Sequence, residues 1–188
     1  MVHQFEFHDT GIEGLKVIEP FYAQDNRGVY IKAFEKDIFA SQGLPGNVHE
    51  ICSTISSKGV LRGLHFLYKN AQAKLVMCTH GALFDVTIDL RANSRTYGKW
   101  HGELMTVKDM KMLFIPAGFA HGSLSLVDDT ILSYYSDAPY LPDSDGGIKW
   151  DDPLFNVEWP FKEYDIKEPI LSDKDKALPY LQSFTVKL

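Results

Sequence analysis

The chain has 188 residues, 45% hydrophobic content and a formal net charge of −6. This length suffices for one ample core without a second domain, so we expect a single domain over residues 1–188. The acidic balance argues against nucleic acid or an anionic membrane as the main partner. With no membrane-length apolar run, no visible export signal and two cysteines, we expect a reduced, cytoplasmic protein.

Short strands and tight turns follow one another along the chain. Alternation of apolar and polar residues predicts strands at residues 29–34, 49–55, 74–79, 83–90, 100–106, 112–115 and 130–135. One short helix is expected at about residues 36–41, ended by Gly43 and Pro45. Many strands with tight turns and almost no helix indicate an all-β sandwich or barrel, and a jelly roll fits the count.

One predicted strand carries acidic residues. Asp85, Thr87 and Asp89 share a face, opposite an apolar face that includes Val86 and Ile88. The two aspartates are consistent with a polar interior or with a solvent face. We expect the solvent face.

Acid–base side chains occur in three segments of the chain. Arg62 and His65 are followed by Lys74. A second histidine, His121, is expected in a glycine-flanked turn, and Tyr134 follows on a later strand. A base, a fixed cation and a phenol are the groups needed to move a proton next to a carbonyl. Tyr134 is followed by a second tyrosine, and since neighbours on a strand alternate faces, we expect one in the pocket and one packed elsewhere. We expect no catalytic role for the other histidines, His3, His8, His49, His80 and His101.

Six sequence motifs, read together, resemble a known enzyme family. They are LRGLH at 61–65, QAKLV at 72–76, FDVTIDLR at 84–91, PAGFAHG at 116–122, GIKWDDP at 147–153 and LSDKD at 171–175. In this order they resemble the dTDP-4-dehydrorhamnose 3,5-epimerase family, over roughly residues 15–180. The resemblance implies an all-β, cupin-type jelly roll with short peripheral helices. It also implies a homodimer that acts, without a catalytic metal or other cofactor, on nucleotide-linked 4-keto-6-deoxy sugars.

The resemblance assigns four catalytic roles. His65 matches the family's general base, and Asp175 matches the carboxylate that fixes the tautomer of this imidazole. Lys74 matches the cation at the keto oxygen, where enolate charge develops. Tyr134 matches the acid that returns a proton on the opposite face of the sugar. We therefore expect inversion at both C3 and C5, with inversion at one carbon or another nucleotide sugar as alternatives.

The resemblance also implies substrate contacts. The matched positions are Arg62 and His121 near the sugar and diphosphate, Arg27 and Lys174 at the nucleotide, Tyr140 stacked on the base, and Asp145 beside it. Part of the nucleotide pocket comes from the partner subunit in this family, so Arg27 and Lys32 are expected to act across the dimer.

Two departures from the family pattern change charge. Lys32 stands where the family has an acid, and Glu50 stands where it has glutamine. Either change could lie on a solvated rim. Two changes of opposite sign also suggest a compensated pair in the base pocket, since burying one charge alone is expensive. On that hypothesis, thymine recognition is weakened or rearranged.

Two other classes of function compete with this interpretation. Metal-dependent cupins need three or more ligands around one ion, but no second histidine lies two residues after His65 and no glutamate lies nearby. A non-catalytic sugar-binding sandwich would give no reason for a base, a cation and a phenol together. We therefore expect an enzyme without a metal site.

Overall fold

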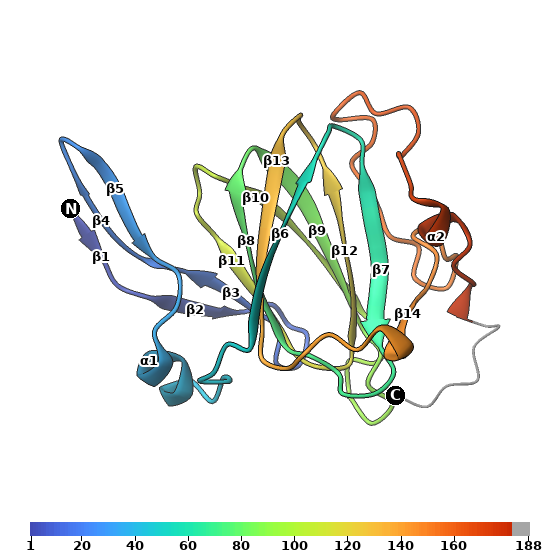
Figure 1. Cartoon of the computed structure of the whole chain (residues 1–188), viewed down its shortest axis with the longest axis horizontal. Helices are drawn as coiled ribbons and strands as arrows, with labels where there is room; N and C mark the ends of the chain where they lie inside the picture. Colours follow the sequence, from blue (N-terminus) through green and yellow to red (C-terminus); the bar gives the residue numbers. More distant parts are fainter. Residues whose placement is uncertain (182–188) are drawn as a thin grey trace.

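Two large antiparallel sheets face each other across a shared apolar interior (Figure 1). The computed structural model describes residues 1–181. The five-stranded sheet has the order β10-β9-β12-β7-β14, and the six-stranded sheet has the order β2-β3-β11-β8-β13-β6. This arrangement confirms the expected all-β, jelly-roll class.

A third, smaller sheet stands apart from these two. It has the strand order β1-β4-β5 and projects from one side of the molecule (Figure 1). The strands of all three sheets are β1 (Val2–His3), β2 (Glu6–Asp9), β3 (Lys16–Glu19), β4 (Phe21–Asp25), β5 (Gly28–Lys32), β6 (Glu50–Ser56), β7 (Leu61–Leu67), β8 (Lys74–His80), β9 (Ala82–Asp89), β10 (Trp100–Thr106), β11 (Met112–Ile115), β12 (Phe119–Ser125), β13 (Thr130–Ser136) and β14 (Asp145–Gly147).

Helices are short and peripheral. They are α1 (Lys36–Ser41), α2 (Asp173–Lys176) and the 3-10 helix η1 (Pro142–Ser144). The expected helix at residues 36–41 is confirmed, and the expected strands are present with end shifts of one or two residues. Alternation did not predict β1 to β4, β14 or α2, because these segments are only two to five residues long. The glycine-flanked turn expected at His121 is wrong, because His121 lies within β12, where Gly122 allows the close approach of β7. Within the described residues, no helix is long and apolar enough to cross a membrane.

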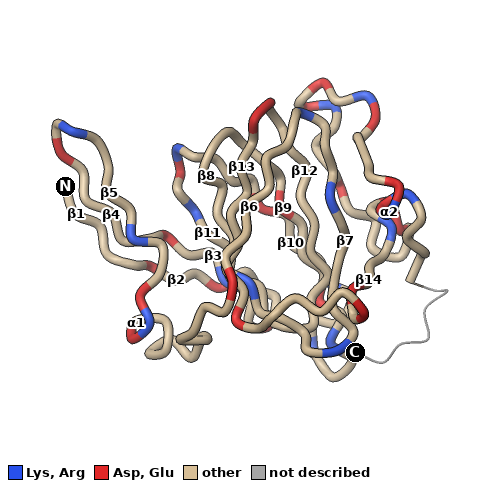
Figure 2. The backbone as a smooth tube through the Cα atoms, in the orientation of Figure 1, with Lys and Arg blue, Asp and Glu red and all other residues tan. Residues whose placement is uncertain are grey.

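The main core lies between the two large sheets. Val76 and Leu113 from the six-stranded sheet pack with Leu83, Met105 and Phe119 from the five-stranded sheet. Burying each such side chain completely contributes about 1.5–3 kcal/mol. Charged residues lie mostly in loops and at strand ends, with few along the middle of the strands (Figure 2).

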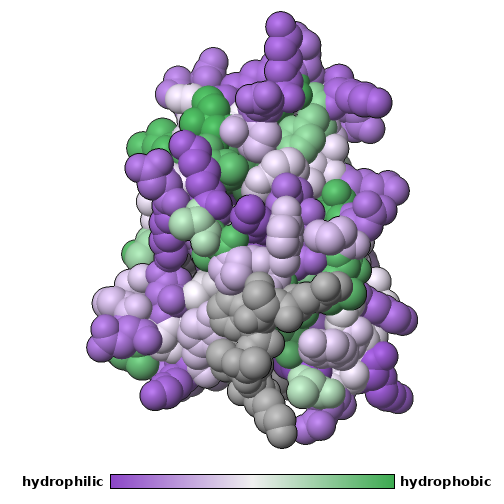
Figure 3. All heavy atoms as spheres, turned by 90° about the vertical axis from the view of Figure 1, so that its right-hand side faces the viewer, coloured by the Kyte–Doolittle hydropathy of each residue, from purple (hydrophilic) through white to green (hydrophobic). Residues whose placement is uncertain are grey.

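The outer face of the five-stranded sheet is covered by the segment that follows β14. Ile148 and Phe155 from this segment pack against Val86 and Ile88 of β9. Strand β9 is therefore buried on both faces. The outer surface on the side of the molecule that carries α2 is largely hydrophilic, with separate apolar patches (Figure 3).

This burial corrects the expectation for the acidic face of β9. Asp85, Thr87 and Asp89 are all 0% exposed, so they do not form a solvent face. They point into the sandwich because the opposite face of β9 is the one that packs under the C-terminal segment. Asp89 accepts hydrogen bonds from Arg91, Ser94 and Thr96.

Candidate active site

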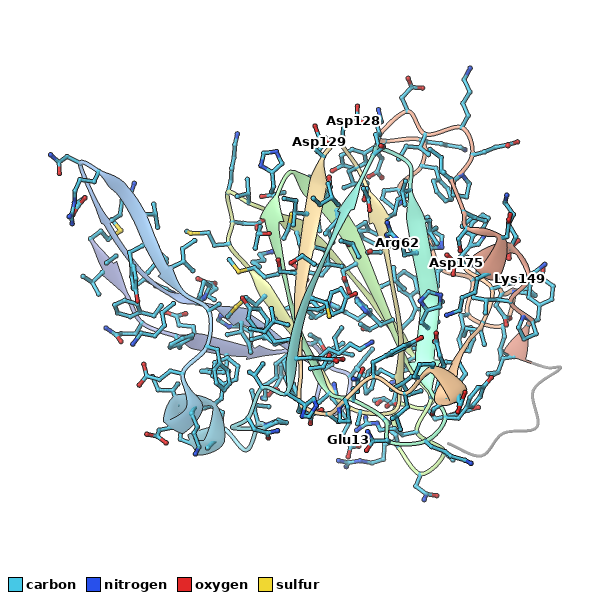
Figure 4. The ribbon with its side chains drawn as sticks, in the orientation of Figure 1. Glu13, Arg62, Asp128, Asp129, Lys149 and Asp175 are labelled. Atoms are coloured by element: carbon cyan, nitrogen blue, oxygen red, sulfur yellow. The ribbon has the colours of Figure 1, made fainter. Side chains whose placement is uncertain are left out.

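A cavity of about 550 Å³ opens between the two large sheets. This volume lies within the range of small-molecule sites. Ten of the sequence-predicted residues line it: His65, Lys74, Tyr134, Asp175, Glu50, Arg62, His121, Tyr140, Asp145 and Lys174. Arg62 comes from β7 and Asp175 from the adjacent α2, on one side of this space (Figure 4). The fold thus gathers residues that are more than 100 positions apart in the chain.

His65 lies on β7 and is bonded to a buried carboxylate. Its Nε2 is 2.5 Å from Oδ1 of Asp175. The other oxygen of Asp175 accepts the hydroxyl proton of Ser172 at 2.8 Å, and Ser172 also caps α2 by accepting the Asp175 backbone N–H. Because Nε2 is committed to the carboxylate, Nδ1 is the ring nitrogen able to accept a proton.

The environment keeps Asp175 ionised. Burial by itself raises the pKa of this carboxyl, but the hydrogen bonds from His65 and Ser172 outweigh burial and hold the pKa below its usual value of 3.8. A negative carboxylate stabilises the imidazolium that forms when His65 accepts a proton.

Two glycines bring the strand of His65 close to its neighbour. A Cβ placed on Gly63 would lie 2.6 Å from Cα of Gly122 and 2.7 Å from the carbonyl oxygen of His121. Gly63 also has a φ of +112°, which side-chain-bearing residues rarely adopt. The pairing of β7 and β12 shifts register at this point, and His65 lies directly opposite His121. The glycines of the LRGLH and PAGFAHG motifs therefore allow the two histidines to meet.

Lys74 is the first residue of β8 and faces the same cavity from the other sheet. Burial lowers the pKa of its ammonium below 10.5, and the nearby carboxylates of Asp145 and Asp85 oppose this effect. Its Nζ forms no hydrogen bond or ion pair with any of residues 1–181. Such a cation is available to an oxyanion in the cavity.

Tyr134 lines the cavity from β13, whereas Tyr135 packs with the apolar cluster on the outer side of that sheet. The expectation that the two tyrosines divide between pocket and packing is confirmed. Burial raises the pKa of the Tyr134 phenol above 10, so the phenol is protonated at neutral pH. It can therefore act as an acid.

Three residues form a connected group at the cavity. Asp145 accepts a hydrogen bond from the Tyr140 hydroxyl at 2.6 Å and a second from Nζ of Lys174. The bond to Asp145 raises the pKa of Tyr140 to about 12. The Tyr140 side chain is 48% exposed, so its ring face is accessible to a flat ligand.

Arg27 and Lys32 do not line the cavity of their own chain. Arg27 is bonded to Asp25 in the turn between β4 and β5. Lys32 Nζ lies 2.6 Å from Glu35 Oε2, while Glu50 accepts from Gln72 Nε2 at 3.0 Å. The expected pair of Lys32 with Glu50 is therefore not formed within one chain, because β5 belongs to the sheet that stands apart.

The structure reveals a contact that sequence reasoning missed. His121 Nε2 lies 3.0 and 2.8 Å from the two carboxylate oxygens of Asp85. The sequence did carry a signal for this pair. Asp85 and Asp89 lie on one face of a strand that is otherwise mostly apolar, and an acidic side chain that becomes buried needs a hydrogen-bond partner. The sequence did not show that both faces of β9 are covered.

An all-β fold with a cavity between two facing sheets, together with the relatives described next, defines the class of carbohydrate epimerases. A sequence model of the dTDP-4-dehydrorhamnose 3,5-epimerase family matches residues 9–183. The chain belongs to the dTDP-4-dehydrorhamnose 3,5-epimerase family, which confirms the resemblance found in the motifs.

Individual relatives agree with this assignment. The dTDP-4-dehydrorhamnose 3,5-epimerase of Methanothermobacter thermautotrophicus is 41% identical over 173 residues, which cover 92% of each chain. That of Escherichia coli K12 is 42% identical over 171 residues, covering 90% of each.

Two solved structures are also similar. One is the epimerase of Legionella pneumophila in complex with dTDP-4-keto-L-rhamnose, with a TM-score of 0.90 and 32% identity over 96% of this chain and 95% of that one. The other is a 3′-monoepimerase from Streptomyces bikiniensis with dTDP-quinovose, with a TM-score of 0.86 and 32% identity over 94% of this chain and 88% of that one.

Proposed function

We propose that this enzyme converts dTDP-4-dehydro-6-deoxyglucose to dTDP-4-dehydrorhamnose by inverting C3 and C5. The observation that carries the proposal is that His65 and Tyr134 reach one cavity from the two facing sheets. A sugar ring held between them meets a base on one face and an acid on the other. Removal of a proton from one face and its return from the other is the minimum requirement for epimerisation.

The 4-keto group makes the protons on both of its neighbouring carbons acidic. Nδ1 of His65 takes a proton from the carbon, the C–H electrons form a carbon–carbon double bond, and the carbonyl electrons move to the keto oxygen. Asp175 stabilises the resulting imidazolium. Lys74, with no competing partner among the described residues, stabilises the enolate oxygen.

Tyr134 completes the inversion. Its protonated phenol donates to the opposite face of the enolate, and the carbonyl re-forms as the carbon gains its new C–H bond. The phenolate then regains a proton from solvent, and His65 releases the one it took. Base and acid each contribute about 10²–10⁴-fold to the rate.

The charged and aromatic side chains of the cavity suit the rest of the substrate. Arg62 supplies donors for the diphosphate, His121 lies in the same cavity beside the sugar, and the accessible ring of Tyr140 provides a stacking surface for the base. Asp145 and Lys174 hold this ring in place through their shared contacts. A nucleoside diphosphate sugar is therefore the substrate class that uses all parts of the cavity.

We also propose that the active enzyme is a homodimer. Strand β5 is an edge of the small sheet and carries exposed Val29 and Tyr30, while β6 is an edge of the six-stranded sheet and carries exposed Ile51 and Ile55. Unpaired, apolar edges of this kind favour pairing with another chain. Because β6 also lines the cavity, β5 of one chain beside β6 of its partner would bring Arg27 and Lys32 to the nucleotide.

Light scattering tests the dimer directly. The parent should have the mass of two chains, and Ile55→Lys should shift it toward one chain and lower its activity. A monomeric, fully active parent would contradict the proposal.

We place the enzyme in the reducing cytoplasm, in line with free thiols at Cys52 and Cys78.

A single-carbon epimerase is the second candidate, because the similar Streptomyces bikiniensis structure is a 3′-monoepimerase. NMR of the keto-sugar nucleotide in deuterated solvent separates the two. Deuterium at both C3 and C5 is expected. Exchange at C3 alone would indicate the single-carbon enzyme. No exchange at either carbon would contradict both candidates and indicate a non-catalytic sugar-binding protein.

A further inference from the structure

Four side chains that commonly bind metal ions gather outside the cavity, where the small sheet meets the six-stranded sheet. They are His3 on β1, Glu6 and His8 on β2, and Glu19 on β3. Glu6 and Glu19 are paired positions of adjacent antiparallel strands. Glu6 and His8 are two residues apart on one strand and so share a face. Strand register therefore brings Glu6, His8 and Glu19 together, and His3 approaches them from β1 of the small sheet.

The separations between these groups resemble those of ligands around a single ion. His3 Nε2 lies 3.4 Å from Glu19 Oε2, and His8 Nε2 lies 3.4 Å from Glu19 Oε1 and 3.8 Å from Glu6 Oε2. Ligand atoms of His3, Glu6 and Glu19 all lie within 4.8 Å of one another, and His3 approaches Glu6 through Nδ1, at 4.0 Å from Oε1. His8 is outside this group of three but lies beside both glutamates. Nitrogen and oxygen ligands at about 2.0–2.2 Å from a tetrahedral zinc ion are about 3.3–3.6 Å apart. The half-exposed glutamates need only a small movement to close on an ion.

A second observation concerns His3 alone. Its Nε2 is buried and forms no hydrogen bond with any described residue. The ring is stacked on Tyr22, with centroids 4.9 Å apart and planes 23° apart, so its orientation is held. Buried polar atoms normally form a hydrogen bond, whereas Nε2 of His3 lies 3.4 Å from Glu19 Oε2 without the geometry of one, and an ion between the two atoms would explain this. A metal ion bonded to Nε2 would satisfy this atom.

We propose that His3, Glu6 and Glu19, with His8 beside the two carboxylates as a fourth ligand, form a structural site for a divalent transition-metal ion of the zinc class. Two imidazoles with two carboxylates suit zinc, whereas magnesium and calcium prefer sites made only of oxygen. The ion would join β1 to the β2–β3 hairpin. It would thereby fix the orientation of the small sheet, which carries Arg27 and Lys32, relative to the six-stranded sheet. The site is separate from the proton chemistry of the cavity.

Calorimetric titration of the full-length, nucleotide-free enzyme with zinc chloride tests this site. The parent should bind one zinc ion per chain, and at about 100 times the dissociation constant its melting temperature should rise by at least about 5 °C. His3→Gln and Glu19→Gln should each lose this equivalent and this shift. His101→Gln is the matched control, because His101 also faces a glutamate on a strand, Glu103 at 3.2 Å, yet belongs to no such group of ligands in the described chain. This control should bind zinc as the parent does.

Two further measurements keep the result decisive. Cys52 is an exposed thiol in the cavity, and Cys52→Ser should retain the zinc equivalent if the ion binds where we propose. Should His3→Gln fail to fold, Glu19→Gln and the visible absorption of cobalt bound to the parent still report the ligands. No zinc uptake by the parent, or uptake that both His3→Gln and Glu19→Gln retain, would overturn the proposal. Magnesium chloride should produce neither effect.

Discussion

His65 and His121 are directly opposed on adjacent antiparallel strands, and each imidazole is held by its own buried aspartate. Opposed residues of such strands have side chains on the same face, about 5 Å apart at Cβ. Two imidazole–carboxylate pairs therefore stand at the cavity: His65 and Asp175 both line it, whereas His121 lines it and its partner Asp85 lies behind. Asp175 is carried by α2 outside the sheet, whereas Asp85 lies within the sheet itself. We propose that His65 abstracts the proton and that His121 contacts the substrate.

Replacing the base should stop the chemistry without unfolding the protein. His65→Ala removes the group that accepts the proton, and we expect solvent-deuterium exchange into the sugar to fall by about 10²–10⁴-fold. NMR at C3 and C5 measures the exchange, and circular dichroism checks the fold. Exchange within about tenfold of the parent would remove His65 from this role.

The partner carboxylate should matter almost as much as the base. Asp175→Asn keeps the size of the side chain, but an amide can hold the imidazole in the wrong tautomer, so we expect a loss on the order of 10²–10⁴-fold in kcat. Ser172→Ala is the control, because it removes the hydroxyl that bonds to the carboxylate and backbone N–H of Asp175 but leaves the charge in place. It should cost far less, and nearly full activity of Asp175→Asn would refute the pair.

The acid and the base can be separated experimentally. Tyr134→Phe removes the phenolic proton and keeps the packing. The rate at which epimerised product forms should therefore fall sharply, while some deuterium exchange on the His65 face of the sugar should remain. Tyr135→Phe, which alters the tyrosine packed on the other side of β13, should leave both activities near those of the parent. Equal loss of exchange and inversion in Tyr134→Phe would mean that Tyr134 only orients the sugar.

Asp89 should contribute stability that depends on pH. Burial by itself raises the pKa of this carboxyl, but the hydrogen bonds from Arg91, Ser94 and Thr96 outweigh burial and lower the pKa from 3.8 to about 2. Because the folded pKa lies below the unfolded one, the contribution is fully present above the unfolded value. It is lost as pH falls from about 4 through about 2, and it amounts to an order of 2 kcal/mol.

Urea unfolding at fixed protein concentration measures this effect. The parent should lose stability between pH 4 and pH 2 more steeply than Asp89→Asn, which should also be less stable at pH 7. Thr96→Val removes one of the donors and should give an intermediate result. Parallel pH profiles for the parent and Asp89→Asn would show that Asp89 does not carry this dependence.

The charge at Lys32 should influence the choice of nucleotide. If the dimer brings Lys32 to the base pocket, an ammonium there disfavours the N–H donor of thymine, so the parent should bind dTDP less selectively than Lys32→Glu does. Calorimetry with dTDP, UDP, CDP and GDP measures the preference, and we expect a change of about tenfold or less. Glu35→Gln is the control, since it frees Lys32 from its partner and keeps the ammonium. A tight dTDP preference in the parent that Lys32→Glu leaves unchanged would place Lys32 outside the pocket.

Sequence alone determined the fold class, the strand pattern and the identity of the residues around the cavity. Period-two alternation shows which residues share a strand face. The motifs around His65 and His121 also contain glycines, and glycine is needed there because the two strands approach each other closely. Ten of the twelve site residues expected from the family resemblance do lie around one cavity.

Only the tertiary structure decided which face of each strand is inside and which charges meet. Alternation cannot tell an inner polar face from a solvent face, and the burial of Asp85 depends on a segment more than sixty residues away that covers the other side of β9. Lys32 pairs with Glu35 rather than with Glu50 because its strand lies in a separate sheet. Pairings between charges are set by three-dimensional distance, and in an antiparallel fold with long connections that distance is not encoded in any local pattern.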